Sequence, residues 1–234
     1  MGIDFHTHLL PNLDDGSRSV EESLEMLVSL QTQGIGKIVA TPHFYSNKAR
    51  LDDFLQKRKA AYGQLQEACP DAAEKLLLGA EVSFFRGMGK ADRIVELCIA
   101  GTKMLLIEMP FFQWGHGEIA ELHQILSRGI TPIIAHIERY FAYQKDFTVL
   151  NEIINLPVFL QVNADALLQR KTRKFVFKLI EHDFQILLGT DCHNMQNRKP
   201  DMNVGRKILA HKYGQSWLEQ LDALGEKLLN KEKA

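Results

Sequence analysis

The feature that most constrains the fold of this chain is a repeated alternation of short apolar runs with segments of helical spacing. Seven β-rich runs are separated by stretches in which apolar side chains recur every three or four residues. Such alternation predicts βαβ units, in which crossover helices join parallel strands. The predicted strands are 3–5, 37–41, 76–80, 104–108, 132–135, 158–162 and 186–189.

The predicted helices lie between and after these strands. The first is the best marked, because Ser19 and Glu22 have the spacing of a capping box and Gly34 marks the end of the apolar pattern. No linker rich in Pro, Gly or Ser divides the chain, so we expect a single domain over residues 1–234. The other helices are predicted over 51–68, 91–100, 118–127, 147–154, 172–182, 202–213 and 217–229.

Several predicted strands are apolar without a break, as at 133–135 and 186–188. Uninterrupted apolar strands are typical of a parallel sheet that helices cover, or of a barrel interior. Seven strand–helix units indicate an α/β barrel of the TIM type with one unit fewer than the usual eight. An open, doubly wound sheet has the same periodicity and is the alternative.

Charge and cysteine content exclude several classes of protein. The 234 residues include 28 basic and 29 acidic side chains, and a near-neutral chain is not expected to hold nucleic acid by bulk electrostatics. The three Cys residues cannot form a disulfide framework and fit a reducing compartment. The amino terminus lacks the features of a signal peptide, and no apolar run is long enough for a membrane span. We therefore expect a cytoplasmic globular protein without membrane insertion.

Side chains that bind metals follow the predicted strands, at the end where α/β barrels carry their active sites. Alternate residues of a strand face the same side, so His6 and His8 can reach one ion together, as can Asp191 and His193. Buried carboxylates at the ends of apolar strands would be costly without cations. The candidate ligands are His6, His8, Asp15, His43, Glu81, Glu108, His136, Asp191 and His193.

Nine candidate ligands are more than a single ion requires. One ion takes about four to six ligands, water included, so the set suits two or three divalent ions. Imidazole and carboxylate ligands together favour Mn, Fe or Zn over Mg or Ca.

The motifs His6-Thr7-His8, Thr41-Pro42-His43 and Asp191-Cys192-His193, with the isolated Glu81, resemble the PHP (polymerase and histidinol phosphatase) family. More narrowly, the segments 8–16, 135–140 and 191–198 resemble the bacterial capsule and exopolysaccharide tyrosine-protein phosphatases. The resemblance runs from residue 3 to about residue 205. It implies a distorted (β/α)7 barrel with a trinuclear site that often contains manganese.

The resemblance also implies a role for each candidate. One ion would be held by His6, His8, Glu81 and Asp191, and a second, bridged by Glu81, by Glu108 and His136. A third would be held by His43, His193 and one Asp of the 14–15 pair; we favour Asp15, and Asp14 is the alternative. Arg139 and Arg198 would bind phosphate, whose oxygens a guanidinium fork matches.

The implied activity is that of a metal-dependent protein-tyrosine phosphatase, which hydrolyses phosphotyrosine with a metal-bound hydroxide. Its implied partner is a phosphotyrosine protein, namely a bacterial tyrosine kinase that regulates capsular or exopolysaccharide synthesis. A phenol has a pKa near 10, so phenolate leaves with little help from a general acid. The alternatives are a small-molecule phosphatase of the histidinol-phosphatase kind, a phosphodiesterase or exonuclease of the PHP family, and a silent module that binds phosphotyrosine.

Cys192 and Arg198 have the C-x5-R spacing of phosphatases that use a cysteine nucleophile. That chemistry needs a thiolate in a tight loop, usually with Gly, at the start of a helix. The five intervening residues contain no Gly, and strand alternation turns Cys192 away from Asp191 and His193. We predict that Cys192 is not the nucleophile.

Two further groups of residues lie near the predicted mouth. The basic cluster at 170–174 is expected to be a solvated helix start, with docking of an acidic or phosphorylated partner as the alternative. Aromatic residues could pack against a substrate phenyl ring, although core or rim packing is the expectation for any one of them. These are Phe84, Phe85, Phe111, Phe112 and Trp114.

Overall fold

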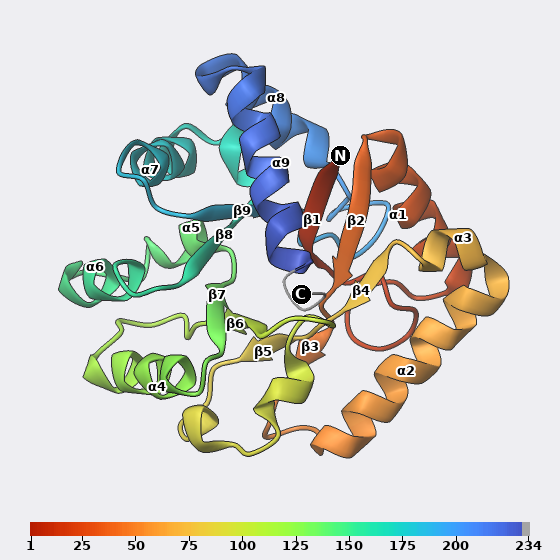
Figure 1. Cartoon of the computed structure of the whole chain (residues 1–234), viewed down its shortest axis with the longest axis horizontal. Helices are drawn as coiled ribbons and strands as arrows, with labels where there is room; N and C mark the ends of the chain where they lie inside the picture. Colours follow the sequence, from red (N-terminus) through yellow and green to blue (C-terminus); the bar gives the residue numbers. More distant parts are fainter. Residues whose placement is uncertain (231–234) are drawn as a thin grey trace.

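The computed structural model describes residues 1–230 and arranges parallel strands in a ring with most of the helices on its outside (Figure 1). The α/β class with parallel strands is confirmed, because every strand pair is parallel. One sheet has the order β1 (Gly2–Thr7), β2 (Ile35–Ala40), β4 (Leu76–Leu78). The other has the order β3 (His43–Phe44), β5 (Glu81–Ser83), β6 (Met104–Glu108), β7 (Thr131–Ile134), β8 (Phe159–Asn163), β9 (Ile186–Gly189).

The two sheets are linked into a distorted barrel at both junctions. A parallel bridge joins Thr7 to Cys192, and the backbone N–H of Asp191 donates to the carbonyl of His6 at 2.8 Å. At the other junction, the N–H of Glu81 donates to the carbonyl of Pro42 at 3.1 Å. These contacts draw the carboxyl ends of strands from both sheets together.

The second and third predicted strands are each interrupted, a feature that the sequence analysis missed. β2 ends before Thr41-Pro42 and β4 ends before Gly79-Ala80, and the short strands β3 and β5 follow in the other sheet. Proline has no N–H for a strand ladder, which explains a break at Pro42. The breaks carry His43 and Glu81 across to the second sheet, where the two residues pair.

The helices pack mostly as predicted. Ser19 caps the first helix, since its hydroxyl accepts from the N–H of Glu22 at 3.2 Å. In a complete capping box the Glu22 carboxylate would accept from the N–H of Ser19. Here it accepts from the N–H of the preceding residue, Arg18, at 3.0 Å. The α-helices are α1 (Val20–Thr32), α2 (Leu51–Ala68), α3 (Pro70–Ala73), α4 (His116–Ser127), α5 (Ile137–Tyr140), α6 (Thr148–Ile154), α7 (Arg170–Glu181), α8 (Met202–Tyr213) and α9 (Gln215–Leu229).

The helix predicted over 91–100 is wrong, because this segment forms only the short 3-10 helix η2 (Ile94–Leu97). Side chains from other parts of the chain donate hydrogen bonds to the backbone carbonyls of this segment. The Arg128 guanidinium donates to the carbonyls of Ala91 at 2.7 Å and Asp92 at 2.9 Å. Those carbonyls would otherwise accept the first hydrogen bonds of an α-helix. Two other 3-10 helices are η1 (Met88–Lys90) and η3 (Ala164–Leu168).

An apolar cluster fills the inside of the ring and leaves the carboxyl ends of the strands to polar residues. It takes Ile3 and Phe5 from β1 together with side chains from β2, β6, β7 and β9. Leu228 and Leu229 of α9 complete it, so this helix lies across the amino ends of the strands (Figure 1). Among residues 1–230, no helix is both long and apolar enough to cross a membrane.

Candidate metal centre

The predicted ligands converge at the carboxyl ends of the strands in three overlapping groups. In each group, one ligand atom from every member lies within 4.8 Å of the others. One group is His8, Asp15, His43 and His193, the second is His6, His8 and Glu81, and the third is His43, Glu81 and Glu108. His136 and Asp191 contact members of these groups. Residues separated by almost the whole length of the chain thus meet in one place.

β1 supplies the middle of the centre. The Nε2 atoms of His6 and His8 lie 3.1 Å apart, and each is 3.3 Å from Oε2 of Glu81. Oδ1 of Asp191 lies 3.6 Å from the first nitrogen and 3.4 Å from the second. Two imidazole nitrogens that face each other and two carboxylates are stable only when protons or a cation lie among them.

Glu81 faces ligands on two sides. Its Oε1 is 3.0 Å from Nε2 of His136, whereas its Oε2 is 2.9 Å from Nδ1 of His43. Glu108 completes the side of His136, with Oε1 at 3.9 Å from Nε2 of that ring. Glu81 thus lies between His43 on one side and His136 with Glu108 on the other.

The neighbouring carboxylates Asp14 and Asp15 have different surroundings. Oδ2 of Asp14 lies 2.8 Å from Nδ1 of His8, on the opposite side of that ring from the centre, and accepts from the N–H of His43 at 2.9 Å. Oδ1 of Asp15 lies 3.4 Å from Nε2 of His43 and 3.5 Å from Nε2 of His193. The geometry therefore groups Asp15 with the ligand atoms, and Asp14 orients a ring behind them.

Gln161 is a supporting residue that the sequence analysis missed. Its Oε1 lies 2.9 Å from Nδ1 of His6 and accepts from the N–H of His136 at 2.7 Å. Contacts of this kind fix the orientation of a metal-binding imidazole. Its position was the available signal, because Gln161 is a polar residue within the apolar run 158–162, the one predicted strand that no candidate ligand ends or follows.

Several buried polar atoms of the centre have no hydrogen-bond partner in the described part of the chain, which shows whether these residues fit metal ions. Within residues 1–230, four of the six such side-chain atoms belong to predicted ligands. Buried polar groups are normally paired, and each one left without a partner costs about 1–3 kcal/mol. Their concentration in one mixed set of imidazoles and carboxylates fits a site for divalent cations. The four atoms are Nδ1 of His43, Oε2 of Glu81, Nδ1 of His136 and Nε2 of His193.

The electrostatics prepare the centre for cations. Burial by itself raises the pKa of Glu81, but the charge of His6 and the hydrogen bond with His136 lower that pKa well below its usual range. Burial lowers the pKa of His193 to about 4 and also lowers the pKa of His136. Those two imidazoles are therefore neutral at pH 7, with a nitrogen lone pair available for a metal.

Backbone strain is concentrated at the same place. His136 and Asp191 have positive φ angles of 29° and 53°, and they are two of the four non-glycine residues with positive φ in the described part of the chain. Such conformations cost free energy and persist only where the surrounding structure imposes them. They turn the chain directly after β7 and β9, so that both side chains reach the centre.

Two guanidinium groups reach the centre, Arg139 from α5 and Arg198 from the loop after β9. Nη2 of Arg139 lies 2.6 Å from Oδ2 of Asp191, and Nη2 of Arg198 lies 2.7 Å from Oδ1 of the same carboxylate. Both arginine side chains remain partly exposed, so they can also contact an anion from solvent. Cys192 differs, because its thiol is fully buried and burial raises its pKa well above the usual range.

The aromatic residues near the mouth fall into two groups. Trp114 is buried, and Phe84 and Phe85 are partly buried and pack against core residues. Phe111 is 40% exposed, and its ring stacks on that of His136 with 5.9 Å between centroids. Tyr143 is 46% exposed and lies 5.5 Å from Phe111. Phe111 and Tyr143 thus form an aromatic wall beside the centre.

Comparison with known proteins adds independent information. The family model described as capsular polysaccharide synthesis, CpsB/CapC, matches residues 2–228. Tyrosine-protein phosphatase CpsB of Streptococcus pneumoniae is 30% identical over 94% of both chains, and tyrosine-protein phosphatase YwqE of Bacillus subtilis is 26% identical over 97% of this chain and 91% of its own.

A solved structure has the same fold. It comes from crystallographic work on YwqE of Bacillus subtilis and CpsB of Streptococcus pneumoniae, which are described there as unique metal-dependent tyrosine phosphatases. The TM-score is 0.83 at 24% identity, over 97% of this chain and 94% of the other. This similarity supports the distorted barrel.

Proposed function

Because this chain belongs to the CpsB/CapC family of capsular polysaccharide synthesis, we propose that it is a metal-dependent protein-tyrosine phosphatase. The observation that carries the proposal is the convergence of nine imidazole and carboxylate side chains next to two arginines. Cations and guanidinium groups in one pocket match the charge of a phosphoryl group in transfer.

Two or three divalent ions would occupy the centre, with Mn favoured and Fe or Zn as the alternatives. When bound, such ions supply Lewis acidity and lower the pKa of a coordinated water. The first would be held by His6, His8, Glu81 and Asp191, the second by Glu108 and His136 with Glu81 shared, and the third by Asp15, His43 and His193.

Arg139 and Arg198 would bind the phosphate oxygens. Each guanidinium group contacts one oxygen of the Asp191 carboxylate. The fork of N–H donors that a guanidinium carries also suits the oxygens of a phosphate. Arg139 lies in α5 after β7 and Arg198 lies in the loop after β9, so they can hold a phosphoryl group from two sides. Their partial exposure leaves room for a substrate above Asp191.

The aromatic wall of Phe111 and Tyr143 favours an aryl phosphate over an aliphatic one. A phenyl ring gains apolar contact and ring stacking against these exposed side chains. Phenolate is also a good leaving group, since the phenol pKa is near 10, so the site needs no strong general acid. We infer that the substrate is a phosphotyrosine protein, and that the physiological one is a bacterial tyrosine kinase acting in capsule or exopolysaccharide synthesis.

The test compares substrates on one metal-loaded preparation. Metal content is first determined by elemental analysis of protein purified without added metal. Turnover is then measured with a phosphotyrosine peptide, the matched phosphoserine peptide, histidinol phosphate and a single-stranded oligonucleotide. We expect the highest kcat/KM for phosphotyrosine, loss of activity with a chelator, and recovery with Mn, Fe or Zn.

Arg139→Ala and His136→Ala are the variants that connect activity to the centre, and both should lose turnover. Faster hydrolysis of histidinol phosphate or of the oligonucleotide would contradict the proposal. Peptide binding without turnover in the metal-loaded protein would instead indicate a silent phosphotyrosine-binding module.

A further inference from the structure

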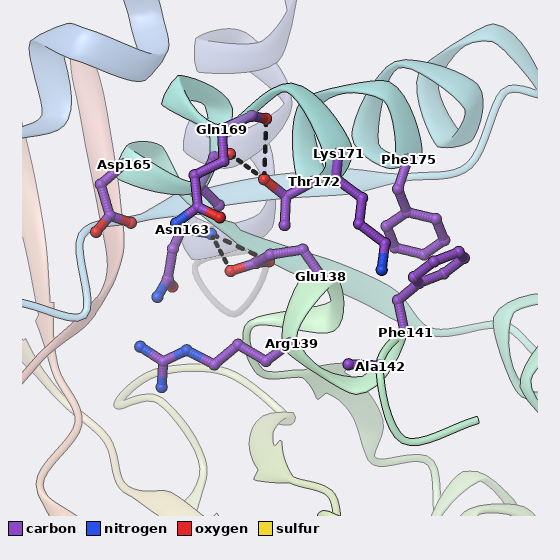
Figure 2. A pocket seen from close by; sticks show the side chains of 11 residues that line it. Glu138, Arg139, Phe141, Ala142, Asn163, Asp165, Gln169, Lys171, Thr172 and Phe175 are labelled. Atoms are coloured by element: carbon purple, nitrogen blue, oxygen red, sulfur yellow. Dashed lines mark hydrogen bonds between the residues drawn. The ribbon is translucent and has the colours of Figure 1, made fainter. Parts of the chain in front are cut away.

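A cavity of about 430 Å³ adjoins the metal centre and shares side chains with it (Figure 2). Arg139 lines the cavity and also pairs with Asp191, and Asn163 lines it while its Nδ2 donates to Oδ2 of Asp191 at 3.2 Å. The cavity lies between α5, η3 and the first turn of α7. A ligand at the metal centre and a ligand in the cavity would therefore be neighbours.

The cavity has an apolar wall with a cation beside it. The rings of Phe141 and Phe175 lie 5.2 Å apart, and Nζ of Lys171 lies 5.5 Å from the centroid of the Phe141 ring. In Figure 2 the Lys171 side chain extends into the cavity next to the two rings, and Arg139 follows the opposite edge. Such a wall supports the carbon chain of a side chain while the ammonium group binds its charged end.

The acidic side chains of the cavity do not pair with Lys171. Glu138 is 4% exposed, and its carboxyl accepts from the N–H of Asn163 at 3.4 Å. Asp165 is exposed and is the acidic group on the edge near Arg139. Lys171 therefore has no carboxylate within ion-pair distance in the described part of the chain.

The sequence around Lys171 adds to this positive charge. Arg170, Lys171, Arg173 and Lys174 all lie in the first five residues of α7, whose first turn has no acidic residue. None of the four forms an ion pair within the described residues. Like charges three and four residues apart, at the positive end of a helix, destabilise the free protein. An anionic ligand would remove this unfavourable interaction.

We propose that the cavity is a subsite for an acidic side chain of the phosphoprotein substrate, close in sequence to the phosphotyrosine. The inference rests on the proposed phosphatase activity and adds a sequence preference to it. Because Arg139 belongs to both sites, a peptide whose phosphate contacts Arg139 brings its next residues to the cavity, since each residue spans at most about 3.3–3.6 Å. The acidic group, a carboxylate or a second phosphate, would pair with Lys171.

The experiment uses phosphotyrosine peptides that differ at one position. A single Glu is placed one, two or three residues before or after the phosphotyrosine, and each peptide is compared with its Gln counterpart. For the wild-type enzyme, kcat/KM at the preferred position should be about threefold to tenfold higher for Glu, as expected for one charge-assisted contact. A phosphoserine at that position distinguishes a phosphate from a carboxylate ligand.

Substitutions at Lys171 assign the preference to the cavity. Lys171→Gln should bring the Glu-to-Gln ratio of kcat/KM close to one, and Lys171→Glu should invert it and favour a peptide with Lys at the same position. Lys178→Gln is the matched control, because Lys178 is exposed on the same helix and does not line the cavity. Its ratio should equal that of the wild type.

The outcomes separate this inference from the proposed function. Equal turnover of the Glu and Gln peptides, or a preference that Lys171→Glu leaves unchanged, overturns the subsite and leaves the phosphatase activity intact. Absence of turnover for every peptide in the metal-loaded wild type overturns the activity, and the subsite with it.

Discussion

Two buried glutamates, Glu81 in the metal centre and Glu138 at the floor of the adjoining cavity, are 1% and 4% exposed. Burial raises the pKa of both carboxyls, yet the final pKa values lie on opposite sides of the ordinary value. The pKa of Glu81 is well below it, whereas that of Glu138 is about 8. The difference comes from the neighbours and not from the depth of burial.

The neighbours are imidazoles in one case and backbone in the other. Glu81 lies within 3.3 Å of ring nitrogens from His6, His8, His43 and His136. Glu138 accepts from the backbone N–H of Asn163 at 3.4 Å, which is too long for strong stabilisation of a carboxylate. One buried acid is therefore held as an anion among cation ligands, and the other is held as a neutral acid.

The largest expected effect comes from Glu81→Gln, which removes the charge at the middle of the metal centre. We expect metal affinity and kcat/KM for an aryl phosphate to fall by more than about 100-fold. Loss of a residue that only orients a metal ligand costs about tenfold to 100-fold, and Glu81 lies among the ligand atoms themselves. Elemental analysis and steady-state kinetics measure both. The same change at Glu138 should leave the metal content unaltered; equal loss of metal in both variants would contradict the contrast between the two sites.

A smaller effect is expected at Asp14, which supports His8 from behind. Burial raises its pKa, but the hydrogen bond and charge of His8 and the N–H groups of His43 and Gly16 together lower that pKa to about 2. Asp14→Asn should weaken metal binding by about tenfold to 100-fold, and Asp15→Asn should weaken it more, since Asp15 lies with the ligand atoms. Metal competition titrations decide the order, and the reverse order would make Asp14 the ligand.

Glu138→Gln tests the neutral acid through the pH dependence of stability. The native pKa of about 8 lies above the ordinary value of 4.5, so between these pH values the native state keeps a proton that the unfolded state has lost. The free energy of unfolding then falls as the pH rises, by up to about 1.4 kcal/mol per pH unit. A non-titrating Gln removes this loss.

The stability difference between Glu138→Gln and wild type should therefore grow in favour of the variant from pH 5 to pH 8. Urea unfolding at a series of pH values measures it. Glu219→Gln, at an exposed position of α9, controls for the loss of one charge. A pH-independent difference would mean that Glu138 is ionised in the native protein at neutral pH.

The smallest effect is expected for Cys192→Ser, which replaces a buried thiol. Burial raises the pKa of this thiol well above its usual range, so it does not supply a thiolate nucleophile. Activity should stay within about twofold of the wild type. Loss of activity in a folded variant that retains its metal would favour cysteine chemistry.

Much of the centre could be predicted because the ends of parallel strands meet at one edge. His6 and His8 follow from strand alternation, and Glu81, His136 and Asp191 follow from their positions after apolar runs. The supporting role of Gln161 could not be predicted from strand position in the same way. Its role depends on Oε1 lying near His6 and His136, which are remote in sequence.

Helix prediction from the spacing of apolar residues failed where side chains remote in sequence bind the backbone carbonyls that a helix would need. The segment 91–100 has helical spacing, but Arg128 takes carbonyls that the helix would need. The end of β2 could have been predicted from Pro42. The transfer of His43 and Glu81 to the second sheet could not, because it depends on how the strands pair around the whole ring. The domain extent and the individual ligand roles stay predictions.

The sequence by itself determined the parallel α/β class, most helices and the edge at which the metal ligands gather, because periodicity and strand direction are local properties. Only the tertiary structure distinguished Asp15 from Asp14 and gave the buried acids Glu81 and Glu138 opposite protonation states. Those distinctions depend on the charges and dipoles within a few ångströms of each carboxyl, and they come from parts of the chain that meet only in the folded protein.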